Sequence, residues 1–193
     1  MQARNVYHHQ PAKLAAFEGH FETGRGDLTI FGIPDEKAGE LKGAVGIPGG
    51  LSFLVHDNFT EDVVGLDKFR PEDRPPILIP FVSWRLMVGF GLAFVALTVY
   101  GSISLRRGTI WGKRWLLALF VLAVVPAVAA NQSGWVAAEV GRQPWIVHPP
   151  IPRDAAGEIA VGADGLVRYD ETVALRTTDA VSRAISREQV ILS

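Results

Sequence analysis

The sequence predicts an all-α membrane protein with two complete transmembrane helices, the start of a third, and extracytoplasmic loops. Residues 81–105 contain a single charged residue, Arg85, and residues 115–138 contain none. At about 1.5 Å per residue each run reaches roughly 36 Å, which exceeds the hydrocarbon core of about 30 Å. The chain ends on EQVILS, an apolar run typical of the first turn of another membrane helix, over 187–193. The alternative is that the two long runs are buried core helices of a soluble protein.

The short connection between the two apolar runs is strongly basic, since it holds Arg106, Arg107, Lys113 and Arg114. Lys and Arg are enriched in the cytoplasmic loops of membrane proteins. We therefore expect a multi-pass chain with the basic loop in the cytoplasm. Its predicted parts are an extracytoplasmic segment 1–77, a membrane helix 78–105, a cytoplasmic loop 106–114, a membrane helix 115–143, an extracytoplasmic segment 144–186 and the truncated helix 187–193.

The composition excludes several classes of site. The formal net charge is −1, so no overall basic field favours binding of nucleic acid. The chain contains no Cys, which excludes disulfides, thiolate metal sites, iron–sulfur clusters and covalently attached c-type haem. The opening residues, MQARNVYHHQPAK, lack the apolar core of a signal peptide. Possible metal ligands are therefore His, Met, Glu and Asp.

The outer segments contain short helix and strand patterns. Residues 11–22, PAKLAAFEGHFE, predict a helix that has a proline near its start and is ended by Gly24 and Gly26. Residues 27–36, DLTIFGIPDE, alternate like a strand and are closed by a proline. Residues 163–165, Ala-Asp-Gly, are suited to the turn of a small hairpin.

One polar and aromatic stripe lies near the end of the second membrane helix. At 100° per residue its members fall within a sector of about 80°, and they are Asn131, Trp135, Glu139 and Arg142. Ionisable groups in a membrane span face the bundle interior, a partner or a cavity. Glu139 is an oxygen ligand that could bind iron or accept protons, and Arg142 could pair with it or hold an anion such as a haem propionate. The alternative is an interfacial ion pair that reaches into water.

The first membrane helix offers a thioether and a cation. Ser83, Met87 and Gly91 are spaced by four and share a face, so small residues above and below Met87 leave space for a flat macrocycle. Methionine is a known axial haem ligand, and the alternative is that Met87 fills the core. Arg85 lies just inside the span and therefore requires an anion.

The first outer helix carries Lys13 and Glu18. These residues are five apart, about 140° around a helix, so they do not form the usual i,i+4 pair. From spacing alone they are two solvated charges. The histidines receive no ligand role, and they are His8, His9, His20, His56 and His148.

Six short blocks of sequence occur in one order along the chain. They are HQPAKLAAFEGHFET, FGIPD, WRLMVGFG, GKRWLL, GWVAAEVGRQPW and LRTTDAVS. In this order they resemble subunit I of the cytochrome bd quinol oxidases, over roughly residues 8–145 and 175–193. The blocks QPAKLAAFEGH and GRQPW are specific, and several such blocks in the right order are not expected by chance.

The resemblance implies a helical subunit of a terminal respiratory oxidase. Such a subunit carries two b haems and either haem d or a further haem b, oxidises quinol at the outer face and reduces oxygen to water. It lies in the bacterial inner (plasma) membrane, takes the protons for water from the cytoplasm, and so helps to build the proton gradient. The implied partners are subunit II of the oxidase, quinol, oxygen and the lipid bilayer.

The resemblance also assigns roles to residues of the first half of the chain. Lys13 and Glu18 match quinol-site positions in the outer Q-loop. Met87 matches the axial methionine of the low-spin haem b, and Arg85 matches the arginine beside that haem.

Three further roles concern the end of the second membrane helix. Glu139 matches the glutamate ligand of the high-spin haem b. Trp135 and Arg142 match residues that line the paired haem site. The carboxylate in this span would then face a haem iron inside the bundle.

The chain departs from the family pattern in three respects. About six further membrane helices would precede it, with the histidine partner of Met87, the haem d histidine and acidic residues of the proton path, so we expect a C-terminal portion that is inactive alone. The Q-loop is short, as in the short-loop branch. Residues 149–174 lengthen a connection that is usually brief. The alternative function is a non-catalytic two-helix membrane remnant or interaction module without haem.

Overall fold

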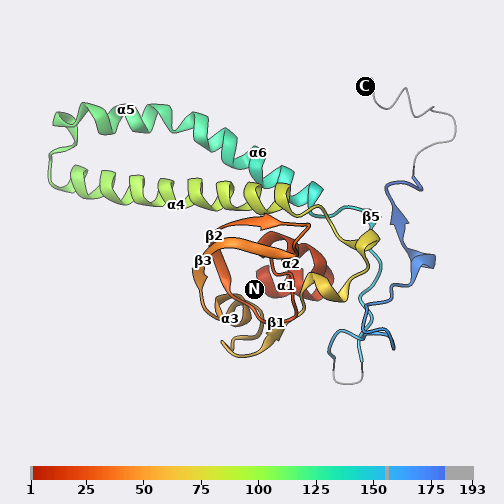
Figure 1. Cartoon of the computed structure of the whole chain (residues 1–193). Coiled ribbons are helices and arrows are strands. Elements are labelled where there is room, and N and C mark those ends of the chain that lie inside the picture. The colour runs from red at the N-terminus through yellow and green to blue at the C-terminus, as the bar shows by residue number, and fades with distance from the viewer. Residues whose placement is uncertain (1, 155–156, 181–193) are drawn as a thin grey trace.

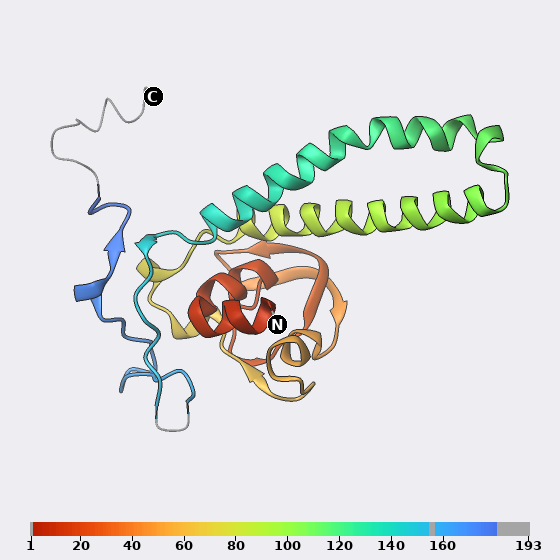
Figure 2. The ribbon, with the colours of Figure 1, turned by 180° about the vertical axis from the view of Figure 1, so that it is seen from behind.

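The computed structural model describes residues 2–154 and 157–180, which form three parts (Figure 1). A folded N-terminal part is followed by a long helical hairpin and then by a C-terminal part. The N-terminal part lies against one end of the helical hairpin, and the other end projects away from the rest of the chain (Figures 1 and 2).

The N-terminal part combines short helices with two small sheets. β1 pairs antiparallel with β4, and β2 pairs antiparallel with β3. The elements are, in order, α1 (Gln2–His9), α2 (Pro11–Glu18), β1 (Gly24–Arg25), β2 (Leu28–Asp35), β3 (Glu40–Ile47), α3 (Gly50–His56), β4 (Asp62–Val63), η1 (Leu66–Lys68) and η2 (Pro71–Asp73).

The helix predicted over 11–22 begins at its proline but ends early, at Glu18. The next residue, Gly19, adopts the left-handed conformation with φ 63°, which glycine enters without the steric cost of a Cβ. The prediction that Gly24 and Gly26 end this helix is therefore wrong.

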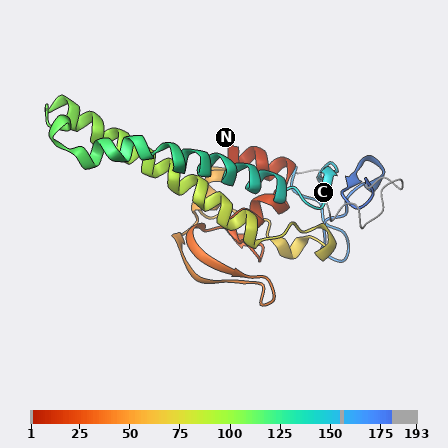
Figure 3. The same ribbon diagram turned by 90° about the horizontal axis from the view of Figure 1, so that it is seen from above.

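Strands correct the expectation of an all-α protein. The described residues are mostly helical but include three two-stranded sheets. The strand predicted over 27–36 is present as β2, and it pairs with β3 from Leu28 opposite Ile47 to Asp35 opposite Glu40. β3 was not predicted because two glycines interrupt its sequence, ELKGAVGI. The β2–β3 ribbon projects to one side of the helices (Figure 3).

The first membrane run forms one continuous helix, α4 (Leu78–Arg106), of 29 residues. At 1.5 Å per residue it is about 44 Å long. It ends one residue beyond the predicted boundary at 105.

The second membrane run is broken into α5 (Arg114–Leu122) and α6 (Val124–Val140). Pro126 explains the interruption at Ala123, because a proline has no N–H to donate to the carbonyl four residues earlier and its ring crowds that carbonyl. α6 ends before the predicted boundary at 143.

The helical hairpin exposes its apolar residues. Both helices are long and apolar enough to cross a membrane, and only 6% of the most apolar window of each is buried within the described structure. A core helix of a soluble protein would be mostly buried, so the described packing does not support that alternative.

The C-terminal part is irregular. It contains β5 (Trp145–Val147), η4 (Glu171–Val173) and β6 (Leu175–Arg176), and β5 pairs antiparallel with β6. Gly165 has φ 73° and a bridge joins Val161 to Val167, so a turn forms at the predicted position, although the described residues form only an isolated bridge there. The third membrane helix predicted over 187–193 lies outside the described residues.

Residues 149–174 complete the core of the N-terminal part. Ile159, Val167 and Tyr169 are buried there. The Val167 N–H donates to the Lys68 carbonyl at 2.8 Å. The shared cluster consists of Tyr7, Ala12, Leu14, Leu51, Val55, Val63, Phe69, Trp145, Ile159, Val167 and Tyr169.

Candidate functional site

A buried ion pair joins α2 to α4. Nη2 of Arg85 lies 3.3 Å from Oε2 of Glu18, and these side chains are only 16% and 5% exposed. The backbone N–H of Thr29 donates to the same carboxylate oxygen at 3.3 Å. The anion that Arg85 was expected to require is therefore Glu18, and Glu18 is not a solvated charge.

Arg85 is held by backbone carbonyls as well as by the carboxylate. Its Nη1 donates to the Phe17 carbonyl at 2.6 Å and the Phe81 carbonyl at 3.1 Å, and its Nη2 donates to the Thr29 carbonyl at 2.9 Å. The guanidinium carbon also lies 3.4 Å from the centroid of the Phe81 ring, a cation–π contact. Arg85 thus fastens the first membrane helix to α2 and β2.

The surroundings of Glu18 act on its protonation in opposite directions. Burial raises the pKa of Glu18, because removing water disfavours the charged form. The charge of Arg85 and hydrogen bonds from Thr29 and Trp84 lower it in part. The net effect is a raised pKa, which makes the carboxylate a better proton acceptor than an ordinary glutamate.

Lys13 contacts α6, since its Nζ donates to the Ala138 carbonyl of that helix at 3.0 Å. Nζ also lies 5.6 Å from the centroid of the Phe17 ring. Burial lowers the pKa of Lys13, and the positive charge of Arg142 lowers it further, while Glu139 opposes them. Lys13 and Glu18 are therefore on the same short helix but contact different membrane helices.

A glycine permits the close approach of α2 to the end of α6. A Cβ built on Gly141 would lie 2.7 Å from Cε1 of Phe17 and 3.3 Å from Cγ of Lys13. The ring of Phe17 stacks on Trp84 of α4, with the centroids 5.2 Å apart and the planes at 14°. Phe17 therefore packs between the two membrane helices, with Lys13 and Glu18 on either side of it in sequence.

The polar stripe predicted for the second membrane helix is present but exposed. Nη2 of Arg142 lies 2.5 Å from Oε2 of Glu139, and the two side chains are 39% and 51% exposed. Nε of Arg142 is buried and makes no hydrogen bond with the described residues. Trp135 is 68% exposed. The structure therefore pairs the acid with the arginine and leaves both accessible to further groups.

Met87 lies at the contact between α4 and α6. Its Sδ would be only 2.7 Å from a Cβ built on Gly134, and Met87 itself is half-buried. The absence of a side chain at position 134 therefore sets where the thioether of Met87 lies. Sequence spacing had pointed to Ser83 and Gly91 as its neighbours and had missed Gly134.

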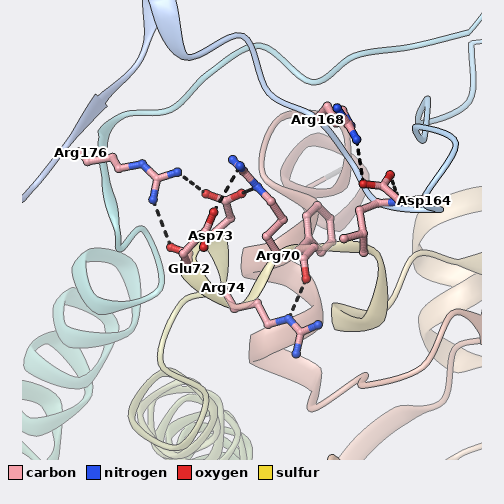
Figure 4. Close-up of polar contacts among 9 residues, drawn as sticks. Arg70, Glu72, Asp73, Arg74, Asp164, Arg168 and Arg176 are labelled. Carbon is pink, nitrogen blue, oxygen red and sulfur yellow. Dashed lines mark hydrogen bonds and ion pairs between the residues drawn. The ribbon is translucent and has the colours of Figure 1, made fainter.

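A second charged cluster, which the sequence analysis missed, joins the N-terminal part to the C-terminal part (Figure 4). Oδ2 of Asp73 lies 2.8 Å from Nε of Arg70, and Oδ1 lies 2.7 Å from Nη2 of Arg176. The Asp73 side chain is fully buried. The guanidinium carbon of Arg176 also lies 4.5 Å from the centroid of the Trp145 ring. No local pattern signals this cluster, because Asp73 and Arg176 are 103 residues apart in sequence.

A match over the whole length of the chain identifies its family. The sequence profile described as cytochrome bd terminal oxidase subunit I matches residues 1–193. The chain belongs to this family. The resemblance inferred from the six sequence blocks is thereby confirmed.

Individual members of the cytochrome bd subunit I family align with most of the chain. A Bacillus subtilis protein provisionally named cytochrome bd menaquinol oxidase subunit I is 34% identical over 155 residues, which cover 76% of this chain and 33% of the relative. The cytochrome bd ubiquinol oxidase subunit 1 of Bacillus subtilis is 31% identical over 159 residues, covering 76% and 34%.

The fold agrees with a solved member of the family. The chain matches the structure of the bd oxidase from Geobacillus thermodenitrificans with a TM-score of 0.66 and 34% identity, over 84% of this chain and 37% of that chain. The chain therefore spans only about a third of the length of the relatives it matches.

The carboxylate of Glu139 and the thioether of Met87, both on the membrane helices, are of types that bind haem iron. The described ranges hold no group of three or more His, Cys, Asp or Glu that could bind a metal ion on its own. A haem needs only one side chain at each axial position. Glu139 offers an accessible carboxylate on a helix with no other charged residue, and Met87 offers a thioether at the contact of two helices.

Proposed function

We propose that this chain supplies the quinol-oxidising loop and two haem ligands of a cytochrome bd oxidase that reduces oxygen to water. The observation that carries the proposal is the position of α2. This helix contacts the Met87 helix through Glu18 and the Glu139 helix through Lys13. One loop element thus touches both helices that would hold haem.

Glu18 is proposed to accept a proton from the quinol hydroxyl as the quinol is oxidised. Its raised pKa suits that task. Arg85 holds the carboxylate in place and compensates its charge when it is ionised. The ammonium of Lys13 has three N–H groups, and one of them donates to the Ala138 carbonyl. Another is proposed to donate a hydrogen bond to a quinol oxygen.

Two haems are proposed to bind this chain, one through Met87 and one through Glu139. When bound, the haems supply one-electron transfer and the reduction of oxygen. Arg85, which pairs with Glu18, is proposed to be the arginine beside the haem that Met87 holds. Arg142 holds the Glu139 carboxylate, and its side chain is 39% exposed, so its guanidinium is proposed to bind an anionic group such as a propionate as well. Trp135 offers an exposed ring on the same helix.

The placement in the cell follows the same proposal. Residues 1–77 and 144–186 face the outside of the bacterial plasma membrane, and residues 106–114 face the cytoplasm. Protons from quinol are released outside and protons for water are taken from inside, which contributes to the proton gradient. The remaining ligands, a third haem of type d or b, and contacts with subunit II come from the parts of the oxidase beyond this chain.

Absorption spectra of the intact oxidase test the ligand roles. Glu139→Ala is expected to remove the high-spin haem b signal and keep the low-spin signal, and Met87→Leu is expected to do the reverse. Each variant is therefore the control for the other. Unchanged spectra in both variants contradict the proposal, and a pigment-free membrane fraction from the unaltered gene favours the non-catalytic alternative.

A further inference from the structure

The turn between the membrane helices carries cations that have no carboxylate nearby. Residues 74–138 contain no Asp or Glu. Within the described chain, no ion pair or hydrogen bond involves the side chains of Arg106, Arg107 and Arg114, which are all exposed. The turn lies at the free end of the hairpin, away from the acidic residues of the N-terminal part (Figure 1). The negative charge that balances Arg106, Arg107 and Arg114 must therefore come from outside the described chain.

Lys113 is the exception among the four cations of the turn. Its Nζ donates to the Tyr100 hydroxyl at 2.9 Å and to Oγ of Ser104 at 3.0 Å. Nζ also lies 4.6 Å from the centroid of the Tyr100 ring. Lys113 therefore fastens the turn to α4, and the three arginines remain available for a ligand.

A groove runs along α4 from one of these arginines toward the middle of the span. Its volume is about 310 Å³. Arg106 lies at one end, and Ile103, Ser102, Val99 and Thr98 follow in that order along the helix. The groove therefore joins a cation at the end near the turn to a lining in which apolar side chains alternate with hydroxyl groups, so a phosphate bound at Arg106 would leave an acyl chain beside Ile103 and Val99.

We propose that this groove and the turn beside it bind an anionic phospholipid. Arg106 contacts the phosphate, Arg107 and Arg114 add positive charge at headgroup level, and an acyl chain lies along Val99 and Ile103. Basic clusters directly beside a membrane span attract anionic headgroups. The inference rests on the proposed placement of the hairpin across the membrane.

Two tryptophans support a headgroup position for the turn. Trp111 is 75% exposed and Trp115 is 55% exposed. Tryptophan is enriched at membrane–water interfaces, where its ring lies among headgroups. The arginines of the turn are thus at the depth at which lipid phosphates are found.

Native mass spectrometry of the intact oxidase, released from nanodiscs of equal phosphatidylglycerol and phosphatidylcholine, tests the inference. The unaltered protein is expected to retain phosphatidylglycerol in preference to phosphatidylcholine. The triple variant R106Q/R107Q/R114Q is expected to lose this preference by roughly tenfold or more, since each removed cation weakens the attraction. Ser102→Leu, which fills the groove without changing charge, is expected to lower retention as well.

A charge-matched control separates the turn from a general effect of net charge. The triple variant R4Q/R25Q/R168Q also removes three exposed arginines, but each of these has a carboxylate partner, in Asp57, Asp27 and Asp164 respectively. It is expected to retain the lipid preference.

Several outcomes overturn the inference. Equal retention of both lipids by the unaltered protein, or an unchanged preference in R106Q/R107Q/R114Q, contradicts it. Retention of neither lipid indicates that a protein surface covers the groove and also contradicts it. The haem spectra of the triple variant are expected to stay normal, so failure here is distinguishable from failure of the proposed function.

Discussion

Glu18 shows at the level of one residue how burial is matched to chemistry. A carboxylate that is 5% exposed is costly unless a cation and hydrogen-bond donors compensate it. Arg85 and the Thr29 N–H supply that compensation, yet the pKa of Glu18 remains raised. The group is therefore held in place and still able to take up a proton.

Replacement of a neighbouring indole tests this balance. Trp84 donates a hydrogen bond that lowers the pKa of Glu18, so Trp84→Phe is expected to raise that pKa further. Glu18 accepts a proton only when ionised, and the acid limb of the pH profile for quinol oxidation should therefore move to higher pH. Steady-state oxygen consumption across pH measures the shift.

Two controls accompany the Trp84→Phe profile. Trp111→Phe, at the exposed turn of the hairpin, should leave the limb in place. Glu18→Gln cannot accept the proton and should lower turnover roughly 100-fold while the haems stay bound. A limb that stays in place in Trp84→Phe, or that moves to lower pH, contradicts the role assigned to Glu18.

The contact between Met87 and Gly134 gives a second prediction for single residues. Gly134→Ala would place a methyl group 2.7 Å from the present position of Sδ, so the thioether must move. Since methionine ligation raises the potential of a b haem, displacement of Met87 is expected to lower the midpoint potential of the low-spin haem. Redox titration followed by absorbance measures it.

Gly89→Ala is the matched control for Gly134→Ala. A Cβ at Gly89 meets no atom within 4 Å in the described structure, and Gly89 lies on the helix that carries Met87 but on another face. The potential should therefore be unchanged in Gly89→Ala. Equal shifts in both variants would argue against an axial role for Met87.

The sequence predicted residue types better than residue partners. That Arg85 requires an anion follows from its place in an apolar span, but spacing cannot indicate that the anion is Glu18, which is 67 residues away. The same limit applies to Met87, whose neighbour Gly134 lies on another helix. Long-range contacts depend on how elements pack, and a single sequence carries no direct record of that.

Among the elements, the segment after the second membrane helix has the clearest structural role. Residues 149–174 place Val167 and Tyr169 in the core of the N-terminal part. The segment is anchored at its end by Arg176, which binds the buried Asp73. This anchor holds the segment that carries α2, although it is not part of the proposed quinol site.

Breaking the anchor is expected to loosen the segment. Figure 4 shows two ion-pair partners of the buried Asp73, Arg70 and Arg176, and Arg176→Gln removes the second of them. The free energy of unfolding is expected to fall by roughly 1–3 kcal/mol. Limited proteolysis should then cleave residues 149–174 faster, and thermal unfolding of the purified protein should begin at lower temperature.

Arg168→Gln is the control for the anchor variant. The Arg168–Asp164 pair lies in the same view but is 71% and 42% exposed, so water already screens it. Its removal should leave both cleavage and unfolding unchanged. Equal cleavage rates for Arg176→Gln and the unaltered protein would show that the segment does not depend on Asp73.

Elements inside the apolar spans were the most predictable, and those outside were the least. The first span, α4, matches the predicted helix 78–105 to within one residue, because a helix is the form that satisfies the backbone in lipid. The break at Ala123 was missed, although Pro126 signals it. β3 was missed because its pairing with β2, and not its own pattern, makes it a strand.

At the scale of the whole molecule, charge and packing agree on one arrangement. Apart from Glu139 near the end of α6, the acidic residues of the described chain lie in the N-terminal and C-terminal parts, and the turn at the other end of the hairpin is basic. α2 lies at the end of the hairpin away from that turn (Figure 1). A membrane between the two ends would separate the proposed quinol site from the cytoplasm.

The absence of cysteine from the chain allows a direct test of this arrangement. Ala38→Cys places a thiol at the exposed end of the β2–β3 ribbon, and Thr109→Cys places one in the exposed turn after α4. In intact cells a membrane-impermeant maleimide is expected to label position 38, whereas position 109 should react only after the membrane is permeabilised. The unaltered chain is the control for background labelling. If both positions react in intact cells, the hairpin does not cross the membrane, because a spanning α4 would place the two positions on opposite sides.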